Sequence, residues 1–403
     1  MSTFDFDICV VGGAGHVGAP LATVLAARGF RTLIYDINDA AVKALMAGRF
    51  PFAEAGGDAA LAQALSSGTL AASSSLDAVA KARVVVVTIG TPVDEFQNPV
   101  WDAVTKCISG LLPALGATEL LVLRSTVAPG TTDALQRFLE SRGMALPVAF
   151  CPERVVQGQA IEEIQRMPQI VSGTSPAAEE RAAALFERVA TSVVRMRPIE
   201  AEFAKLFCNA YRYIQFAASN QFFMMAQAAG CEYRRIVTGM RQDYARMQGF
   251  PGAGFTAGPC LLKDTLQLVA GSNYQFELGH AAIHVNEGLP AFVVDDIRRR
   301  YPVNEMVVGI LGTAFKADSD DIRSSLSYKL KKLLVLHARE VLTTDPHVTV
   351  DLELRSLDEV VRRSDLLVVA TPHAEYRNLD VHGKPVVDIW NVLPIPAAAA
   401  GIG

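Results

Sequence analysis

A chain of 403 residues is longer than one hydrophobic core usually organises, and it predicts two or three domains. Half of the residues are hydrophobic and a fifth are charged, which is typical of a globular protein and excludes a largely disordered chain. The formal net charge of −5 supplies no basic surface, so nothing in the composition supports binding to nucleic acid.

The N-terminus and the cysteines both bear on the cellular compartment. Residues 1–7 are acidic and lead directly into a strand-like segment, without the basic and apolar regions of a signal peptide. No apolar stretch reaches the roughly 18 to 20 residues that a membrane helix needs. The six cysteines include no CxxC pair, and five of them are expected to be small core residues. We therefore expect a cytoplasmic protein that is not bound to a membrane.

Strand-like and helix-like segments alternate over the first 200 residues. Apolar runs at 8–11 and 32–35 flank a glycine-rich turn and an Ala- and Leu-rich helix, which together predict a βαβ unit. Further runs that suit buried strands follow at 84–88, 120–123, 148–150 and 169–172, with a helical pattern at 133–141. This alternation predicts a parallel, doubly wound sheet.

A long segment without glycine or proline comes next. Residues 200–229 suit one helix of roughly 45 Å, at about 1.5 Å per residue. A Gly- and Pro-rich stretch lies farther along the chain, at 249–259. The length of the helix and the apolar residues on more than one of its faces predict a homodimer interface, with Phe203, Phe207, Tyr211, Phe216 and Phe222 as its candidates.

The strand and helix alternation resumes near residue 301. Strand-like runs occur at 306–311, 340–344, 366–369 and 386–389. The predicted fold class is therefore α/β, with two Rossmann-like doubly wound domains joined by a central helical domain that contains one long helix. The expected boundaries are 1–197, 198–300 and 301–403.

The first glycine turn has the residues that a dinucleotide site requires. Gly13 is expected to permit the tight turn, Gly15 to let the backbone approach a pyrophosphate, and Gly18 to let the helix pack on the strand. The N-terminus of the helix offers N–H groups to the phosphates. Asp36 ends the next strand, where a carboxylate binds ribose hydroxyls and repels a 2′-phosphate, so NAD is predicted over NADP. His16 within the turn is expected to fill space rather than to act in catalysis.

Two further groups of residues suggest chemistry. Cys260 lies in a loop of small residues that opens a helix, where the helix dipole favours a thiolate, although a buried structural cysteine is the commoner explanation of such a residue alone. Lys205 and Asn209 lie four residues apart on the long helix and so share one face. A solvated stripe would have this spacing too, but the apolar neighbours favour buried polar groups that need a partner.

Short motifs in a fixed order carry a resemblance over nearly the whole chain. They are Gly13 to Gly18, Gly90-Thr91-Pro92, Ser125-Thr126-Val127, Pro152-Glu153, Glu202 with Lys205 and Asn209, Gly258-Pro259-Cys260 with Lys263 and Asp264, and Phe315-Lys316 with Asp321 and Arg323. In this order they resemble the UDP-glucose, UDP-N-acetylhexosamine and GDP-mannose dehydrogenase family. The resemblance makes Cys260 a candidate nucleophile rather than a core residue.

The resemblance implies an N-terminal NAD domain, a central helical domain that dimerises and a C-terminal domain that holds the substrate's nucleotide. It implies roles for the residues as follows. The cofactor-binding residues are Gly13, Gly15, His16, Val17, Gly18, Asp36, Thr91 and Pro92, and the substrate-binding residues are Glu153, Lys205, Asn209, Phe255, Gly258, Phe315, Lys316 and Arg323. The catalytic residues are Cys260, Lys205, Asn209, Asp264, Glu153 and Thr126.

Within that set, Cys260 would capture an aldehyde, and Lys205 and Asn209 would stabilise developing oxyanions. Asp264 would help to order Lys205 and water, and Glu153 would act as an acid/base or water-positioning group. The implied reaction is a four-electron oxidation of the sugar C6 alcohol. A first hydride leaves to NAD, the thiolate adds to the aldehyde, the thiohemiacetal gives a second hydride to a second NAD, and the thioester is hydrolysed.

The identity of the substrate stays open. Gln157 stands where glucose-oxidising members often have a glutamate, and residues 151–155 resemble the N-acetylhexosamine branch, whereas 258–264 resemble the glucose and GDP-mannose branches. UDP-glucose and UDP-N-acetylhexosamines such as UDP-ManNAc and UDP-GlcNAc are expected first, and GDP-mannose or dTDP-glucose second.

Two functions of a different kind are also compatible with a Rossmann domain and a long helix. One is a two-electron dehydrogenase of the hydroxyacid type, which would need no cysteine, and the other is a non-catalytic NAD-binding protein. No metal site is predicted, because the seven histidines do not cluster with cysteine or carboxylate at ligand spacing.

Overall fold

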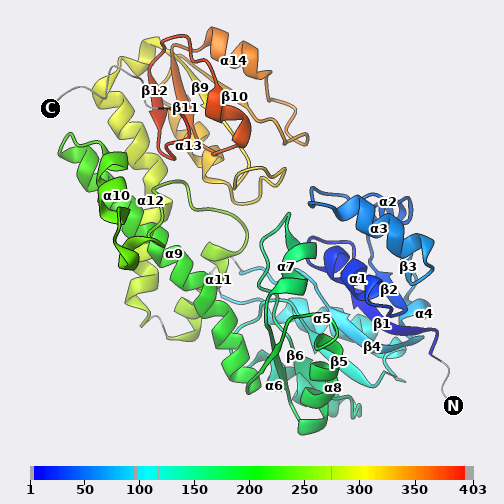
Figure 1. Cartoon of the computed structure of the whole chain (residues 1–403). Helices are drawn as coiled ribbons and strands as arrows, with labels where there is room; N and C mark the ends of the chain where they lie inside the picture. The colour runs from blue at the N-terminus through cyan, green and yellow to red at the C-terminus, as the bar shows by residue number, and fades with distance from the viewer. Residues whose placement is uncertain (1–3, 95–97, 117, 274, 395–403) are drawn as a thin grey trace. The chain divides into compact units, whose positions relative to one another are not determined.

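The computed structural model describes residues 4–94, 98–116, 118–273 and 275–394, and it divides into two compact units. The first unit holds the chain as far as Cys208, together with Leu266–Gly271. The second holds Asn209–Thr265 and the chain from Ser272 onward. Each unit contains one mainly parallel sheet (Figure 1).

The first unit contains an eight-stranded sheet in the order β3-β2-β1-β4-β5-β6-β7-β8. Its strands are β1 (Phe6–Val11), β2 (Thr32–Tyr35), β3 (Leu70–Ser73), β4 (Ala82–Val87), β5 (Leu120–Leu123), β6 (Val148–Phe150), β7 (Gln169–Gly173) and β8 (Val193–Arg195). The connecting helices are α1 (Gly18–Ala27), α2 (Asp39–Met46), α3 (Gly57–Ser66), α4 (Leu76–Val79), α5 (Trp101–Leu111), η1 (Leu112–Ala114), α6 (Thr131–Ser141), α7 (Ala160–Arg166) and α8 (Pro176–Phe186).

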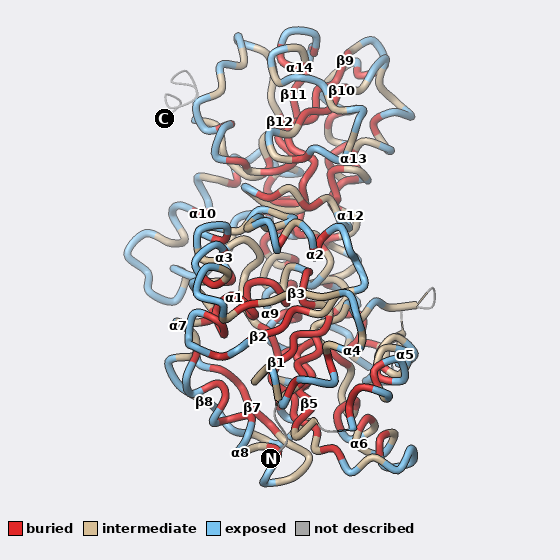
Figure 2. The backbone as a smooth tube through the Cα atoms, turned by 90° about the vertical axis from the view of Figure 1, so that its right-hand side faces the viewer, coloured by how far each residue is buried: buried red, intermediate tan, exposed pale blue. Residues whose placement is uncertain are grey.

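Helices cover both faces of this sheet, as a doubly wound fold requires. One core packs α1, α3, α7 and α8 against the strands, and a second core packs α4, α5 and α6 against the opposite face. The central strands β1 and β5 are mostly buried because both faces of the sheet are covered (Figure 2). The sheet order turns back between β1 and β4, which is where ligands bind in folds of this kind.

The prediction of a parallel sheet is wrong at one pair of strands. β6 and β7 are antiparallel, with Ala149 opposite Gly173 and Phe150 opposite Ser172. The chain after Cys151 re-enters the sheet at the end where β6 leaves it, and the apolar pattern of a short buried strand does not encode its direction. The sequence patterns also missed β3 and β8, which lie at the two edges of the sheet and have few fully buried residues.

The second unit combines long helices with a four-stranded sheet. The predicted long helix is present as α9 (Pro198–Ala228), whose last 20 residues belong to this unit. The other helical segments are α10 (Tyr233–Arg241), η2 (Ala245–Met247), α11 (Leu261–Gly271), α12 (Glu277–Arg300), η3 (Val303–Glu305), α13 (Leu326–Val335), α14 (Leu357–Arg363) and η4 (Ala374–Asn378). The parallel sheet has the order β10-β9-β11-β12, formed by β9 (Val307–Leu311), β10 (Glu340–Thr344), β11 (Leu366–Val369) and β12 (Val386–Asp388).

A single hydrophobic core joins the central helices to the C-terminal sheet. It brings together Phe223 of α9, Val293 of α12 and Val308 of β9. These elements therefore form one compact unit, although the sequence assigns them to two domains on either side of residue 300. The expected α/β class, with mainly parallel sheets and one long central helix, is confirmed.

Two of the cysteines expected in the core are not there. Cys9 and Cys151 are buried and Cys107 is half-buried, but Cys208 and Cys231 are exposed. Both exposed residues lie on or just beyond α9, where the apolar composition made every position look internal. Among the described residues, no helix is both long enough and apolar enough to cross a membrane.

Candidate functional site

The glycine turn after β1 differs in one detail from its prediction. The residue with a left-handed backbone is Gly12, at φ +69°, rather than Gly13. Gly13 is still required, because a Cβ there would lie 2.4 Å from the carbonyl oxygen of Val10. A Cβ on Gly18 would lie 2.6 Å from the carbonyl oxygen of Gly12, so α1 packs tightly on the turn, whereas Gly15 is exposed.

Asp36 connects this turn to the end of β2. Its Oδ2 accepts a hydrogen bond from the backbone N of Ala14 at 3.0 Å, and its Oδ1 accepts one from the N of Asn38 at 2.9 Å. The residue before α1, Val17, provides no side-chain cap to the N-terminus of the helix. A half-buried carboxylate and an uncapped helix N-terminus therefore flank one turn, which suits the ribose and the phosphates of a dinucleotide.

His16 makes a contact that the sequence patterns did not predict. Its Nδ1 lies 3.0 Å from Nε2 of Gln157, which is 141 residues away along the chain. Its ring also packs on Phe52, with the centroids 4.0 Å apart. The fold therefore places Gln157 directly beside the glycine turn.

The loops after β4 and β5 meet next to this region. The hydroxyl of Thr91 donates a hydrogen bond to the backbone oxygen of Thr126. The Oγ of Ser125 donates to the backbone oxygen of Ile89 at 2.7 Å. Pro92 is exposed. The structure thus brings together Thr91, an expected cofactor-binding residue, and Thr126, an expected catalytic residue.

Glu153 is held by an arginine that the sequence patterns did not single out. The buried guanidinium of Arg124 donates to Oε2 of Glu153 through Nε at 2.8 Å and also through Nη2. The Oε1 of Glu153 accepts the backbone N–H groups of Arg154 at 2.6 Å and Val155 at 2.8 Å. The sequence feature that could have predicted this pair is a basic residue directly after the apolar run 120–123, because a buried cation needs an anionic partner.

Glu202, Lys205 and Asn209 of α9 are buried, so the alternative of a solvated stripe is wrong for these residues. Glu202 is fully buried, and Lys205 and Asn209 are 8% and 7% exposed. Glu202 accepts hydrogen bonds from the N of Gly130 at 2.5 Å, the N of Thr132 at 2.7 Å and the hydroxyl of Thr132 at 2.6 Å. Glu202 therefore binds the N-terminus of α6, where a negative charge is favourable.

Cys260 directly precedes α11 and is exposed. Its carbonyl oxygen accepts the N–H of Asp264 at 2.9 Å, which places the thiol at the N-terminus of the helix. The carboxylate of Asp264 is fully buried and contacts Nδ2 of Asn209 at 2.5 Å and Nζ of Lys263 at 2.9 Å. By contrast, burial raises the pKa of the Cys107 thiol to about 11 and that of Cys151 to about 12, which makes both unreactive.

Arg323 lies near the thiol of Cys260. Hydrogen bonds from its guanidinium to Asp321 raise the pKa of Arg323, and the interaction with Cys260 adds to this effect. The Nη2 of Arg323 is 2.6 Å from Oδ2 of Asp321, which fixes the guanidinium. A cation beside a thiol favours the thiolate, which is the form that adds to an aldehyde.

The Cys260 loop packs closely on the loop after β9. Gly258 has φ +102°, and a Cβ there would lie 2.4 Å from the ring of Phe315. Phe315 and Lys316 are half-buried, whereas Phe255 is 2% exposed and belongs to the hydrophobic core. The structure therefore brings Gly258, Cys260, Phe315 and Arg323 together within the second unit.

The second unit brings two histidines together with two carboxylates, although the histidines show no metal-ligand spacing along the sequence. One potential ligand atom from each of four residues lies within 4.8 Å of the others, in a cluster formed by Asp318, His347, His373 and Glu375. These residues follow three different strands, so no local spacing revealed them.

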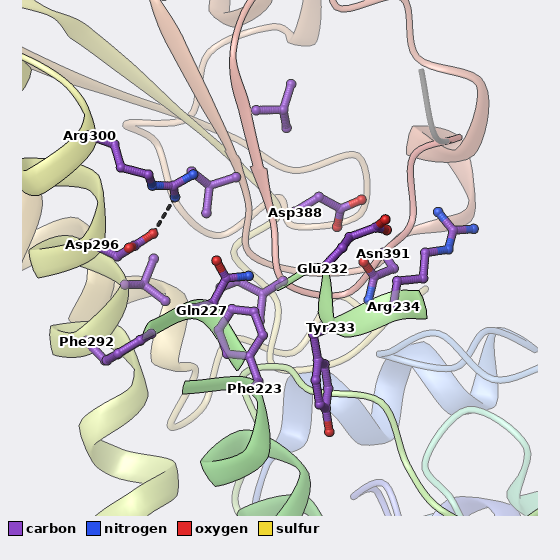
Figure 3. A pocket seen from close by; sticks show the side chains of 14 residues that line it. Phe223, Gln227, Glu232, Tyr233, Arg234, Phe292, Asp296, Arg300, Asp388 and Asn391 are labelled. Carbon is purple, nitrogen blue, oxygen red and sulfur yellow. Dashed lines mark ion pairs between the residues drawn. The ribbon is translucent and has the colours of Figure 1, made fainter. Parts of the chain in front are cut away.

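A pocket in the second unit is lined by side chains of α9, α10, α12 and β12 (Figure 3). Arg300 pairs with Asp296 on one side of it, and Arg234 donates to the backbone oxygen of Leu393 at 3.1 Å. Burial raises the pKa of Asp388, which also lines the pocket. None of the residues that were predicted to act in binding or catalysis is among its described lining residues.

Comparison with known proteins gives matches along nearly the whole chain. The NAD binding domain of the UDP-glucose/GDP-mannose dehydrogenase family matches residues 6–190, its central domain matches 199–288, and its UDP binding domain matches 309–395. A UDP-N-acetyl-D-mannosamine dehydrogenase from Pyrococcus horikoshii is 28% identical over 97% of this chain and 98% of its own length.

Two solved structures are similar throughout. A UDP-D-ManNAc dehydrogenase from Pyrococcus horikoshii has a TM-score of 0.88 at 26% identity, with 96% of each chain covered. A UDP-glucose dehydrogenase from Pyrobaculum islandicum has a TM-score of 0.87 at 27% identity, with 98% of this chain and 97% of the other covered.

Proposed function

Because the chain belongs to the UDP-glucose/GDP-mannose dehydrogenase family, we propose that it oxidises C6 of a UDP-N-acetylhexosamine to a carboxylate with two molecules of NAD. The family membership makes it an NAD-dependent oxidoreductase that acts on nucleotide sugars. The main observation in support of this reaction is the exposed Cys260 directly before α11, four residues before the buried carboxylate of Asp264.

The proposed catalytic residues would act in sequence on the sugar. NAD supplies the hydride acceptor. The Cys260 thiolate, favoured by Arg323 and by the helix N-terminus, would add to the C6 aldehyde. Asn209, held by Asp264, would donate a hydrogen bond to the oxyanion that results, and Lys205 would stabilise it further. Loss of a second hydride to a second NAD would convert this thiohemiacetal into a thioester, and water would then hydrolyse the thioester to the carboxylate and the free thiol.

Residues of the first unit would bind the cofactor and order water. Asp36 would accept the ribose hydroxyls, and the turn from Gly13 to Gly18 would bind the pyrophosphate. Thr91, Pro92 and Thr126 would line the cofactor side. The four hydrogen bonds on Glu153 support a role in positioning water or substrate groups.

The sugar is proposed from Gln157 and from the relatives. Gln157 lies beside His16, at the position where glucose-oxidising members often have a carboxylate. The match with UDP-N-acetyl-D-mannosamine dehydrogenase from Pyrococcus horikoshii also supports an acetamido sugar. UDP-glucose is the second candidate, because residues 258–264 resemble that branch and the Pyrobaculum islandicum enzyme has a similar structure.

A substrate panel tests the proposal. Purified protein and NAD would be mixed with UDP-ManNAc, UDP-GlcNAc, UDP-glucose, GDP-mannose or dTDP-glucose, and NADH absorbance would be followed to completion. We expect two NADH per UDP-N-acetylhexosamine. One NADH per sugar would instead indicate a two-electron dehydrogenase, and no turnover with any sugar would contradict an enzymatic role.

A homodimer formed through α9 is part of the proposal. Phe203, Phe207 and Tyr211 are 36%, 55% and 63% exposed and lie four residues apart, on one face of the helix. Exposed aromatic residues in such a row are typical of a subunit interface. Light scattering at micromolar concentration should give a dimer for the wild type and a monomer for Phe207→Glu. A monomeric wild type would contradict the proposal.

We also propose that the protein works in the cytoplasm. Cys9, Cys107, Cys151, Cys208 and Cys231 form no disulfide, and Cys208 and Cys231 are exposed. Exposed free thiols are typical of a reducing compartment. Cell fractionation that found the protein outside the cytoplasm would contradict this assignment.

A further inference from the structure

The second sheet repeats the local arrangement of the first sheet's glycine turn. In both, a carboxylate that follows the second strand of a βαβ unit accepts backbone N–H groups of the turn after the first strand. Asp36 accepts the N of Ala14 at 3.0 Å, and Asp345 accepts the N of Thr313 at 2.6 Å and the N of Ala314 at 2.9 Å. Asp345 thus has the position from which a Rossmann carboxylate binds ribose.

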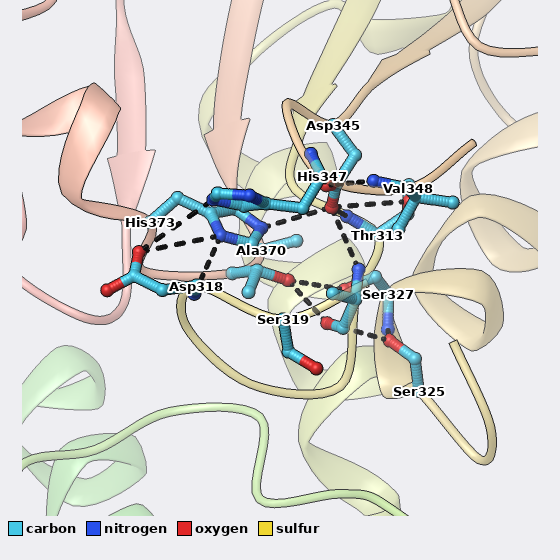
Figure 4. A network of polar contacts seen from close by, with 12 residues as sticks. Thr313, Asp318, Ser319, Ser325, Ser327, Asp345, His347, Val348, Ala370 and His373 are labelled. Atoms are coloured by element: carbon cyan, nitrogen blue, oxygen red, sulfur yellow. Dashed lines mark hydrogen bonds and ion pairs between the residues drawn. The ribbon is translucent and has the colours of Figure 1, made fainter. Parts of the chain in front are cut away.

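Asp345 differs from Asp36 because a histidine covers it. The side chains of Asp345 and His373 are both fully buried, and Nε2 of His373 lies 3.0 Å from Oδ2 of Asp345 (Figure 4). Burial raises the pKa of Asp345, but hydrogen bonds from His373 and from the turn outweigh it and lower the pKa below its ordinary value. This carboxylate is therefore not available to a ribose.

The other nitrogen of His373 holds the loop after β9. Its Nδ1 accepts the backbone N–H of Asp318 at 3.0 Å, and Oδ1 of Asp318 accepts the N of Ala374 at 3.0 Å. The lone pair of Nδ1 is therefore used by the N–H of Asp318, and the ring contacts Asp345 through Nε2. A metal ion in the cluster with His347 and Glu375 would have to displace the N–H of Asp318, so the geometry favours a structural clamp over a metal site.

The clamp holds the loop on both sides of Phe315 and Lys316. Asp345 fixes Thr313 and Ala314 before them, and His373 fixes Asp318 after them. The hydroxyl of Thr371 also donates to the backbone oxygen of Ala314 at 2.7 Å. The three residues between these points, Phe315, Lys316 and Ala317, have little freedom to move relative to the sheet.

We propose that His373 is a positioning residue that, with Asp345, fixes the Phe315–Lys316 segment for binding of the substrate's nucleotide. This inference rests on the proposed function, in which Phe315 and Lys316 belong to the nucleotide-sugar site. Neither His373 nor Asp345 touches substrate in this scheme. In a dinucleotide-binding fold the carboxylate at this position binds ribose. In this sheet the buried pair of Asp345 and His373 supports the loop instead, so the same fold can bind a different nucleotide.

Two substitutions separate the two hydrogen bonds of the ring. His373→Asn places an acceptor near Nδ1 but is too short to reach Asp345, whereas His373→Gln keeps a donor near Nε2 and loses the acceptor for Asp318. The loss of one buried hydrogen bond corresponds to about a tenfold effect. We expect each variant to raise KM for UDP-ManNAc about tenfold, and His373→Ala to raise it further, with kcat and KM for NAD little changed. His382→Asn is the matched control, because His382 is exposed in the same unit.

A second measurement does not depend on turnover. Hydrogen–deuterium exchange should become faster in peptides that cover residues 312–319 of the His373 variants and stay unchanged in the first glycine turn. Unchanged exchange in the loop would overturn the inference. A fall in kcat with constant KM would also overturn it, because a lower fraction of folded enzyme explains that result.

The outcomes also separate this inference from the proposed function. A wild type that oxidises UDP-ManNAc, with His373 variants of unchanged KM, overturns the positioning role alone. A wild type that oxidises no nucleotide sugar overturns the proposed function and this inference together. Stoichiometric binding of Zn²⁺ that is lost in His347→Ala would assign the cluster to a metal and overturn the clamp.

Discussion

Arg124 and Glu153 form an ion pair in the interior of the first unit, with side chains that are 1% and 10% exposed. The same guanidinium donates to the carbonyl oxygen of Cys151 at 3.2 Å and to Oε1 of Gln169 at 2.9 Å. The pair therefore fixes the segment that leads into Glu153 and Gln157, and it contributes to stability as well as to the site.

Replacement of Arg124 by methionine should destabilise the protein. The substitution leaves the Glu153 carboxylate buried without its cation, and the loss of one partner of a buried pair costs about 3–5 kcal/mol. Urea unfolding would measure the change in the free energy of unfolding. Arg166→Met is the control, because Arg166 pairs with Glu162 on the surface, where such a pair contributes about 0–1 kcal/mol. Equal effects of the two substitutions would contradict the role given to Arg124.

Asp36 should decide the choice between NAD and NADP. Asp36→Ala removes the carboxylate that would accept the ribose hydroxyls and repel a 2′-phosphate. We expect the ratio of kcat/KM for NAD to that for NADP to fall by about tenfold or more, as for the loss of a charged hydrogen bond. Asp39→Ala, at the start of α2, is the control. A wild type that uses both cofactors equally would contradict the assignment.

Cys260→Ser should separate the two oxidations. A serine alkoxide is harder to form than a thiolate, and its ester is a more stable acyl intermediate. We expect either the loss of the second NADH or a covalent adduct, which mass spectrometry of the intact protein after incubation with substrate and NAD would detect. Cys231→Ser, another exposed cysteine, should behave like the wild type. Full turnover by Cys260→Ser without an adduct would mean that the nucleophile is wrongly assigned.

Glu202 should make stability depend on pH in an unusual direction. Burial raises its pKa above the ordinary value of 4.5, against the hydrogen bonds from Thr132 and Gly130. A carboxyl with a raised pKa binds more protons in the folded state, so its contribution is complete below about pH 4.5 and is lost as the pH rises through the folded pKa. The difference in free energy of unfolding between the wild type and Glu202→Gln should therefore decrease as the pH rises from about 4.5 through the folded pKa.

Glu200 provides an internal comparison for this measurement. Its side chain pairs with Arg197, which lowers the pKa of Glu200. Its contribution is therefore lost as the pH falls, so the difference between the wild type and Glu200→Gln should change in the opposite direction. Parallel pH profiles for the two variants would contradict the prediction that burial raises the pKa of Glu202.

Local patterns were sufficient to predict much of the fold. The glycine turn, the apolar strand runs and the Gly- and Pro-rich approach to Cys260 each depend on neighbouring residues, and their positions agree with the structure. Gly12 shows the limit of such patterns, since the motif spacing assigned the tight turn to Gly13.

Partners that are distant in sequence could not be predicted. Arg124 and Glu153 are 29 residues apart, and Asp345 and His373 are 28 apart, in loops that meet only after the strands have paired. The antiparallel direction of β7 is likewise set by the path of the whole segment after β6. In each case the stabilising contact joins two segments, and neither segment is distinguished by its own neighbours in the sequence.

The core shared by the central helices and the C-terminal sheet limits how this chain can be divided in the laboratory. A fragment that ends near residue 300 would expose the faces of Phe223 and Val293 that normally pack against β9 and its neighbours, and it should aggregate. Chimaeras that exchange substrate preference with a relative should therefore transfer residues from Asn209 onward as one block, with Leu266–Gly271 left as in the recipient.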